Sequence, residues 1–289
     1  YIGVSNKVSD ATVITPTTAN TSYYAVYTES ITFYYYNGTA HTKTTLTRRM
    51  LSNGSSYSNS LSGSEPVVSN YDGASKTAWS YDPNHYESSY IRTSLATGTN
   101  NLYTIYTKSV TSTFNYYGGS KAATTTVSSN KYYVSKDSGI NTFNTNITIP
   151  DAVKANRGSY TYRGVSTNNT ANASVVTPTT ANTTYYSSYT YAITANFTAN
   201  GGTGTAPSAV AGTGYMNYSG SKIGISVTMP SNTFARNGYT FGGWNDTVVN
   251  KTYTAGTSTT IDSSRDFNAT WNVVTYTIKY NLNGGTLEN

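Results

Sequence analysis

The sequence predicts a mainly β protein, with an α+β arrangement as the alternative, organised as a tandem array of small domains. An alternating apolar pattern ends in glycine four times, at Gly38, Gly119, Gly202 and Gly285, which lie 81, 83 and 83 residues apart. Such an interval is a whole small domain rather than one turn of a solenoid. The chain holds 30 Tyr against 7 Phe and 3 Trp, and Tyr and Thr favour the pleated surface of a sheet.

The first predicted strand of each repeat, called the opening strand, ends at this glycine. Five residues before the glycine stand aromatic residues: Phe33, Phe114, Phe197 and Tyr280. Apolar positions two residues apart share one face of a strand, and Thr, Asn, Lys and Tyr fill the other face. The Asn-Gly and Gly-Gly pairs at the end accept the positive φ that a tight turn requires.

Each repeat also ends in a predicted strand, called the closing strand. Two positions four residues apart are mostly aromatic in it: Tyr23, Leu102, Tyr185 and Phe267 at the first, Tyr27, Tyr106, Tyr189 and Trp271 at the second. The even offset gives the strand one buried face. The next opening strand follows almost at once, without a flexible linker, so we expect an elongated and stiff rod.

Between these strands the repeats differ. Gly238 to Trp244 reads Gly-Tyr-Thr-Phe-Gly-Gly-Trp, Ser159 to Val165 is a looser version, and the first repeat keeps little beyond Trp79. Residues 1–4 look like the end of the same motif. The only helix signal is one turn over 151–155, which Pro150 would start.

Three features of the last complete repeat occur together. They are Asn200-Gly201-Gly202-Thr203-Gly204 after a strand, the run from Arg236 to Trp244, and a strand that ends in Trp271. With these features the repeat resembles the Listeria–Bacteroides repeat, also called the internalin B-repeat. The Thr15-Pro16 and Thr177-Pro178 stretches resemble the Thr-Pro turn before the final strand of that family.

The resemblance is strong over 191–272, fair over 108–190 and weak over 29–107, where most of the Gly-Tyr-Thr-Phe motif is missing. It implies a small β-grasp-like fold in tandem copies on bacterial surface proteins, often as stalk or adhesive segments. The family supplies no catalytic residues to transfer.

Five segments are predicted along the chain. Residues 1–28 form the C-terminal part of a preceding repeat, 29–107 a divergent repeat 1, 108–190 repeat 2, 191–272 repeat 3, and 273–289 the first strand of a following repeat. Both ends therefore fall inside a repeat, as expected for part of a longer chain.

Charge and composition argue against several functional classes. Only 10% of the residues are charged, the net charge is +6, and the only adjacent basic pair is Arg48-Arg49, so we expect no nucleic-acid partner. The absence of Cys excludes thiolate chemistry and fits a bacterial surface protein. No apolar run approaches the roughly 20 residues that span a bilayer, so this segment is not expected to insert into a membrane.

No constellation of residues supports an enzyme. Acid–base or nucleophilic catalysis needs titratable groups brought together. His41 and His85 both lie in repeat 1 and have no counterparts in the other repeats. Asp262 and Asp266 flank Arg265, which repels a cation, and a calcium site wants more oxygen anions. We expect no catalytic residue, no cofactor and no metal.

Tyr34 and Tyr36 are the candidate ligand contacts. They point opposite to Phe33 and Tyr35 on the opening strand, so both side chains are expected to be exposed. Exposed aromatic rings stack on sugars or partner proteins, whereas Tyr on a sheet also serves as cross-strand packing. Both interpretations stay open for this pair.

The sequence thus predicts a non-enzymatic, extracellular stalk or adhesin segment of a large bacterial surface protein, which spaces or displays a binding region. One alternative is a module that binds a host glycan or surface protein through exposed Tyr. Another is a subunit that assembles with neighbouring copies of itself into a filament or surface layer. The residues expected to carry the structural role are Phe33, Phe114, Phe197, Tyr280, Trp244 and Trp271.

Overall fold

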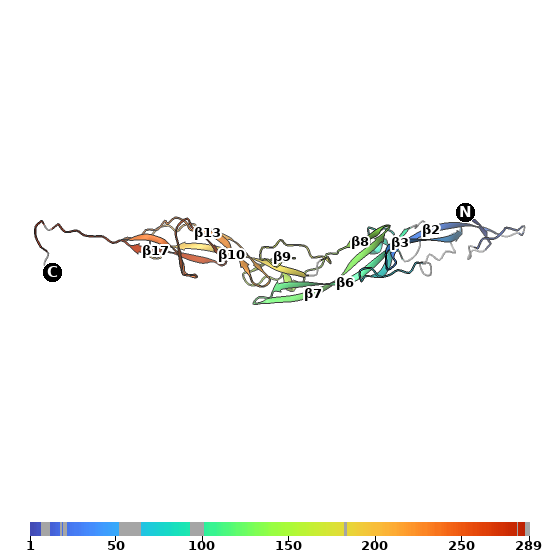
Figure 1. Cartoon of the computed structure of the whole chain (residues 1–289), viewed down its shortest axis with the longest axis horizontal. Helices are drawn as coiled ribbons and strands as arrows, with labels where there is room; N and C mark the ends of the chain where they lie inside the picture. The colour runs from blue at the N-terminus through green and yellow to red at the C-terminus, as the bar shows by residue number, and fades with distance from the viewer. Residues whose placement is uncertain are drawn as a thin grey trace. The chain divides into compact units, whose positions relative to one another are not determined.

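The computed structural model describes residues 1–6, 12–17, 19, 22–51, 65–92, 101–181, 184–281 and 283–286. In chain order its elements, labelled in Figure 1 where there is room, are β1 (Gly3–Ser5), β2 (Tyr24–Tyr36), β3 (His41–Leu51), β4 (Ser75–Ser80), η1 (Ser88–Tyr90), β5 (Ile91–Arg92), β6 (Asn101–Tyr117), β7 (Ala122–Lys136), β8 (Gly139–Phe143), α1 (Asp151–Lys154), β9 (Thr161–Ser166), β10 (Thr184–Thr198), β11 (Val210–Asn217), β12 (Lys222–Ile223), β13 (Ile225–Thr228), β14 (Tyr239–Asp246), β15 (Lys251–Tyr253), β16 (Ser258–Ile261) and β17 (Arg265–Val273).

The protein is mainly β, which confirms the predicted class. α1 is the single helical turn predicted after Pro150. Within the described residues, no helix has the length and apolar character needed to cross a membrane.

The chain divides into two compact units. Unit 1 comprises Tyr1–Thr113, Thr126–Thr148 and Thr177–Thr183, and unit 2 comprises Phe114–Thr125, Ile149–Val176 and Thr184–Asn289. Predicted repeat 1 lies in unit 1 and predicted repeat 3 in unit 2, whereas the residues of predicted repeat 2 are distributed between the two. The five predicted segments and their boundaries stay a prediction.

β10 is the central strand of unit 2. It pairs in parallel with β17, from Ala195 opposite Arg265 to Thr198 opposite Asn268, and antiparallel with β9 and β11. β14 pairs antiparallel with β17 and with β15, so the sheet is mixed, while β13 and β16 form a separate two-stranded sheet. Two parallel neighbours need a crossover of a dozen or more residues. Here the chain between them forms β11 to β16.

β2 plays the same part in unit 1. It pairs in parallel with β6, from Thr32 opposite Asn101 to Tyr34 opposite Tyr103, and antiparallel with β1 and β3. β4 pairs antiparallel with β6 and β5, and β7 forms a hairpin with β8. Two groups of buried residues fill this unit: Ile31, Phe33, Trp79 and Leu102 in one, Ala74, Tyr106 and Tyr133 in the other.

β2 and β10 each serve two predicted segments. β2 starts in the closing strand of residues 1–28 and continues through the opening strand of repeat 1. β10 likewise joins the closing strand of repeat 2 to the opening strand of repeat 3. The prediction that these strands abut without a linker is confirmed at both places. The joint is an uninterrupted strand, whose backbone is held by the hydrogen bonds of the sheet on either side.

The pairing register also repeats. The strand before each closing strand, called the motif strand, is β1, β4, β9 or β14. In each case one residue of the motif strand lies directly opposite the small residue midway along the closing strand. The four pairs, with the motif-strand residue first, are Val4 and Ala25, Trp79 and Thr104, Val165 and Ser187, and Trp244 and Ala269. In the last three the register skips the residue two positions earlier: Thr77, Arg163 and Gly242. A β-bulge at the same position is what copies of one element would share.

The repeated Thr-Pro segment covers the motif strand. In unit 2, Val176 forms a β-bridge with Val165, and Val175 packs over Gly164. Gly164 has a φ of +151°, and a Cβ there would lie 2.7 Å from Cγ1 of Val175, so only glycine fits. The equivalent residues of unit 1, arranged in the same way, are Ile14, Val4, Val13 and Gly3.

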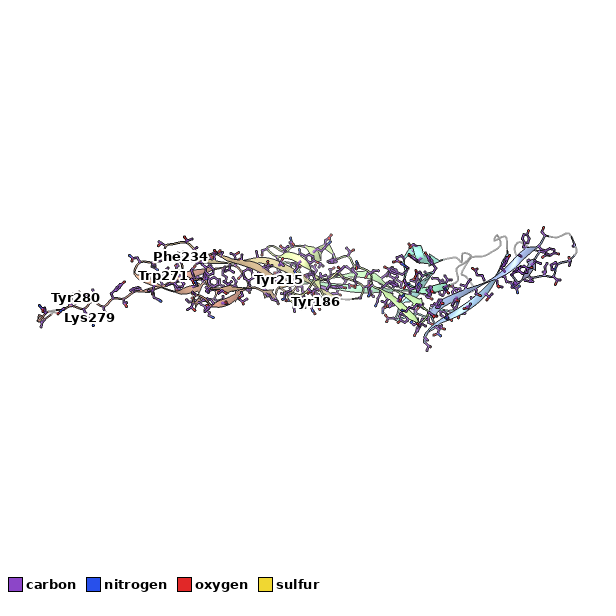
Figure 2. All side chains as sticks on the ribbon, turned by 90° about the horizontal axis from the view of Figure 1, so that it is seen from above. Tyr186, Tyr215, Phe234, Trp271, Lys279 and Tyr280 are labelled. Atoms are coloured by element: carbon purple, nitrogen blue, oxygen red, sulfur yellow. The ribbon has the colours of Figure 1, made fainter. Side chains whose placement is uncertain are left out.

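The segment after β17 differs from the prediction. Residues 274–281 form no strand, and the side chain of Tyr280 is 70% exposed (Figure 2). Placing Tyr280 in a core is therefore wrong for this structure. The opening strand that contains Phe197 is held by a parallel partner, in which Phe267 lies opposite it, whereas residues 274–281 have no such partner among the described residues. An isolated strand is not stable in water, whatever its apolar pattern.

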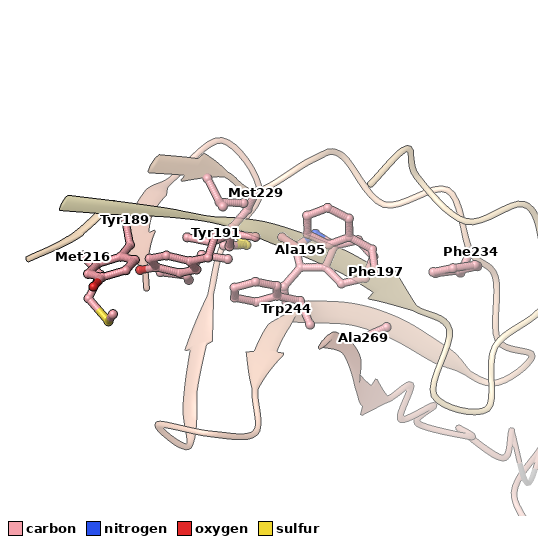
Figure 3. Packing of buried hydrophobic residues seen from close by; sticks show 13 residues of the cluster. Tyr189, Tyr191, Ala195, Phe197, Met216, Met229, Phe234, Trp244 and Ala269 are labelled. Atoms are coloured by element: carbon pink, nitrogen blue, oxygen red, sulfur yellow. The ribbon is translucent and has the colours of Figure 1, made fainter. Parts of the chain in front are cut away.

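The core of unit 2 lies along β10. Figure 3 shows Phe197 and Ala195 of β10 with Trp244, which comes from β14. Tyr191 and Tyr189 lie towards the beginning of β10, with Met216 of β11 beside them. Trp244 has no exposed surface, and Phe197 is 3% exposed. Full burial of one aromatic side chain of this size contributes roughly 1.5–3 kcal/mol.

Candidate functional site

The parallel pair of an opening and a closing strand is the candidate functional site, because it recurs in both units. In repeat 3 the pair consists of residues 195–198 of β10 and 265–268 of β17. In repeat 1 it consists of residues 32–34 of β2 and 101–103 of β6. We call this arrangement the opening–closing pair.

Aromatic residues pack against the opening–closing pair from the motif strand. Phe197 meets Trp244 edge to face, with ring centroids 5.1 Å apart and planes at 64°. Phe33 meets Trp79 in the same way, at 5.0 Å and 65°. Four of the six predicted structural residues are buried as expected: Phe33, Phe114, Phe197 and Trp244. Trp271 is half-buried.

The second aromatic position of the closing strand is bonded to the end of the opening strand. In repeat 1 the hydroxyl of Tyr106 accepts a hydrogen bond from the backbone amide of Tyr36 at 2.7 Å. In unit 2 the hydroxyl of Tyr189 accepts one from the amide of Tyr117 at 3.3 Å. The indole of Trp271 donates to the carbonyl of Ala199 at 3.0 Å. We call Tyr106, Tyr189 and Trp271 the latch residues.

The latch explains one of the glycines that mark the repeats. A Cβ on Gly202 would lie 2.6 Å from Cζ2 of Trp271, so the indole ring occupies the space that a larger residue would need. The turn before it uses the positive φ that the Asn-Gly pair predicts, with φ of 44° at Asn200 and 86° at Gly201.

Side chains add bonds across the opening–closing pair of repeat 3. The amide of Asn196 donates to the carboxylate of Asp266 at 2.9 Å, and the hydroxyl of Thr198 donates to the amide oxygen of Asn268 at 2.5 Å. Each bond joins residues that are direct cross-strand neighbours. Such polar pairs each contribute about 0.2–1 kcal/mol.

The two motif-strand tryptophans use different acceptors. The indole of Trp244 donates to the backbone carbonyl of Pro230 at 2.8 Å. The indole of Trp79 donates instead to the carboxylate of Glu65, which also accepts a bond from Lys76 at 2.7 Å. Burial disfavours the charged form of Glu65, but the hydrogen bonds from Lys76 and Trp79 outweigh this effect and lower its pKa.

A buried ion pair fixes the start of the closing strand in repeat 3. Arg265 lies 2.6 Å from the carboxylate of Asp246, whose side chain is completely buried. The other oxygen of Asp246 accepts a bond from the amide of Val248 at 2.9 Å. The hydrogen bond that Arg265 donates to Asp246 raises the pKa of Arg265.

Tyr34 and Tyr36 are half-buried, not exposed as expected. The ring of Tyr34 stacks on that of Tyr103 at 4.6 Å, and the ammonium of Lys43 lies 5.7 Å from its centroid. Tyr36 packs edge to face on Tyr71 at 5.3 Å. Both rings therefore take part in packing within unit 1, and a ligand contact at either residue stays a prediction.

The titratable residues considered in the sequence analysis each make a separate packing or pairing contact. His41 packs between Tyr36 and Tyr71, and burial lowers its pKa. His85 stacks on Tyr90 at 3.7 Å. Asp262 pairs with Arg265, and Asp266 with Asn196. The described parts of the chain contain no cluster of three or more His, Cys, Asp or Glu residues that could hold a metal ion.

Sequence reasoning missed Glu65 and the Asp246–Arg265 pair. A signal for Glu65 existed, because it precedes Trp79 by 14 residues, as Pro230 precedes Trp244. No local pattern marks Asp246, whose partner Arg265 lies 19 residues later.

The fold and this site define a class: a mainly β protein whose mixed sheets are built around parallel opening–closing pairs. No known protein family, curated protein or solved structure matches the chain. The resemblance of residues 191–272 to the Listeria–Bacteroides repeat therefore stays a prediction.

Proposed function

We propose that this chain is a non-enzymatic, extracellular stalk or adhesin segment of a large bacterial surface protein, built as a rod of tandem β-grasp-like domains. The observation that carries the proposal is the sharing of strands. β2 and β10 each pass from one predicted repeat into the next with no connecting segment. Every further repeat then adds length without adding a flexible linker, and a spacer requires this property.

Two further observations support parts of the proposal. A mixed sheet with its first and last strands parallel and adjacent fits a β-grasp-like domain. Only 10% of the residues are charged. The exterior is therefore hydrated mainly through hydroxyl and amide groups, and it has few charges that attract ions. The bacterial surface location rests on the sequence resemblance and on the absence of Cys.

Small-angle X-ray scattering of the 289-residue chain tests the rod. A compact globule of this length has a radius of gyration of about 19 Å, and an unfolded chain one of about 60 Å. The proposal predicts a value between these limits together with a linear cross-section region typical of rods. A value near that of the globule would refute it. Antibody labelling of intact cells of the source organism tests the location.

The alternatives predict different results. A module that binds a host glycan or surface protein would give hits on a glycan or protein array that Tyr34→Ala or Tyr36→Ala abolishes. A self-assembling filament or surface-layer subunit would form regular polymers in negative-stain images at high protein concentration. The stalk proposal predicts neither result for the isolated chain.

A further inference from the structure

We infer that tension along the chain loads the opening–closing pair of each repeat in shear, so that each repeat is a force-bearing unit closed by its latch residue. The biological setting of this inference rests on the proposed stalk, whereas its mechanical content concerns the chain alone.

The direction of the two strands dictates how force acts on them. In repeat 3 the chain enters the opening strand on the side of Ala195 and leaves the closing strand on the side of Val273. Because the two strands are parallel, pulling the ends apart draws β10 back towards its start and β17 forward towards its end. The strands slide past each other along their length. Hydrogen bonds between them run across the strands, so they share the load and must break together.

The latch residues lie where they oppose this sliding. Cross-strand pairing in repeat 3 ends at Thr198 opposite Asn268, and Trp271 reaches from beyond that point to the carbonyl of Ala199. Sliding in the direction of tension lengthens the distance between these two groups. Tyr106 and Tyr36 have the same relation in repeat 1, beyond the pair of Tyr34 and Tyr103.

Both described opening–closing pairs add side-chain bonds to the backbone pairing. In repeat 3 the side chains of Asn196 and Thr198 donate to Asp266 and Asn268 on the neighbouring strand. In repeat 1 the hydroxyl of Thr104 donates to the backbone carbonyl of Tyr34 at 2.9 Å. These bonds add to those that resist shear.

Single-molecule pulling on the full chain tests the inference through the choice of attachment points. The chain has no Cys, so two introduced thiols are its only attachment points. Ala192→Cys with Val273→Cys pulls repeat 3 in shear, because Ala192 and Val273 are exposed residues at the start of the opening strand and the end of the closing strand. Ala206→Cys with Val273→Cys instead loads repeat 3 from the exposed loop that follows the opening strand and from the end of the closing strand. The force then reaches both strands from the side where they end and peels the pair, one bond at a time.

The shear geometry is expected to need a several-fold higher unfolding force than the peeling geometry at the same pulling speed. Equal forces in the two geometries would overturn the inference.

The latch is tested in repeat 1, where hydroxyl deletions can be matched. Exposed Ser30 and Ser109 serve as attachment points for shear when replaced by Cys. Tyr106→Phe removes the bond to Tyr36 and is expected to lower the unfolding force. Tyr103→Phe, on the same strand, removes a hydroxyl that takes no part in the latch and is expected to leave the force unchanged. Equal effects of the two variants would overturn the role of the latch.

The pulling measurements can refute the shear inference without refuting the stalk proposal, and the scattering test can do the reverse. A compact shape in scattering would refute the rod and leave the ratio of shear to peeling force intact. Equal forces would refute the shear clamp and leave the shape of the chain intact.

Discussion

The guanidinium of Arg265 donates to the carboxylate of Asp246 across 2.6 Å, and the aspartate is completely buried. This bond joins the end of β14 to the start of β17, which are antiparallel neighbours with Asp246 opposite Phe267. It therefore fixes the closing strand of repeat 3 on its motif strand, next to the opening–closing pair.

Removing the arginine should unfold repeat 3 selectively. Arg265→Ala leaves a buried, unpaired carboxylate and is expected to cost about 3–5 kcal/mol. Fluorotryptophan labelling gives separate fluorine NMR signals for Trp79 in repeat 1 and for Trp244 and Trp271 in repeat 3, because the chain has only three Trp residues. Urea unfolding followed on these signals should shift for repeat 3 alone.

Lys154→Ala is the matched control for the ion pair. Its partner Asp151 is 96% exposed, and an exposed pair contributes about 0–1 kcal/mol. A cost for Arg265→Ala as small as that of the control would contradict the role given to the buried pair.

Repeat 1 should be more sensitive to acid than repeat 3 at its motif-strand tryptophan. The pKa of Glu65 is lowered from 4.5 in the folded state, so its stabilisation is complete above that value and is lost as the pH falls through the lower folded pKa. The carbonyl of Pro230 does not titrate in this range. The Trp79 signal should report a falling free energy of unfolding below about pH 4.5 that Glu65→Gln makes less steep. The same slope in the variant would show that other groups cause it.

Gly164 should tolerate no side chain. Gly164→Ala combines backbone strain of about 1–3 kcal/mol with overpacking of about 1–3 kcal/mol against Val175. Gly158 has a φ of +60° with nothing within 4 Å of a Cβ, so Gly158→Ala should show the strain alone. Urea unfolding of unit 2 measures both. Adding Val175→Ala to Gly164→Ala should recover the overpacking part, and a purely additive double variant would disprove the contact.

Phe197 and Tyr280 occupy the same place in the repeated pattern and should respond differently to truncation. Phe197→Ala removes a buried ring and is expected to cost about 3–5 kcal/mol. Tyr280→Ala removes an exposed one and should stay within about 0.5 kcal/mol. Thermal unfolding of the two variants compares them, and a large effect of Tyr280→Ala would mean that the segment after β17 is packed in solution.

The strands and their equivalent residues could be predicted because both depend on local spacing. Alternation by two residues placed Phe33 and Phe197 on buried faces, and Trp79 was recognised as what the first repeat keeps of the motif that ends in Trp244. The same pattern failed for Tyr280, since a strand also needs a partner.

Cross-strand contacts could not be predicted from one strand alone. Tyr34 was expected to be exposed, but the register of β2 against β6 sets Tyr103 beside it, and the rings stack. The hydrogen-bond acceptor of the Trp79 indole likewise depends on where the fold places the chain around Glu65. A local pattern of apolar residues does not encode this placement.

The measurement that tests the central claim most directly is the distance distribution between spin labels on the two repeats that β10 joins. Exposed Thr161 in β9 and Ser226 in β13, each replaced by Cys, report on repeats 2 and 3 within unit 2, and Ser226 with exposed Val273 gives the width expected for two sites inside one repeat. Since the joint is an uninterrupted strand, the account predicts a single distribution as narrow for Thr161 and Ser226 as for Ser226 and Val273. A broad or multiple distribution for the first pair beside a narrow one for the second would contradict it.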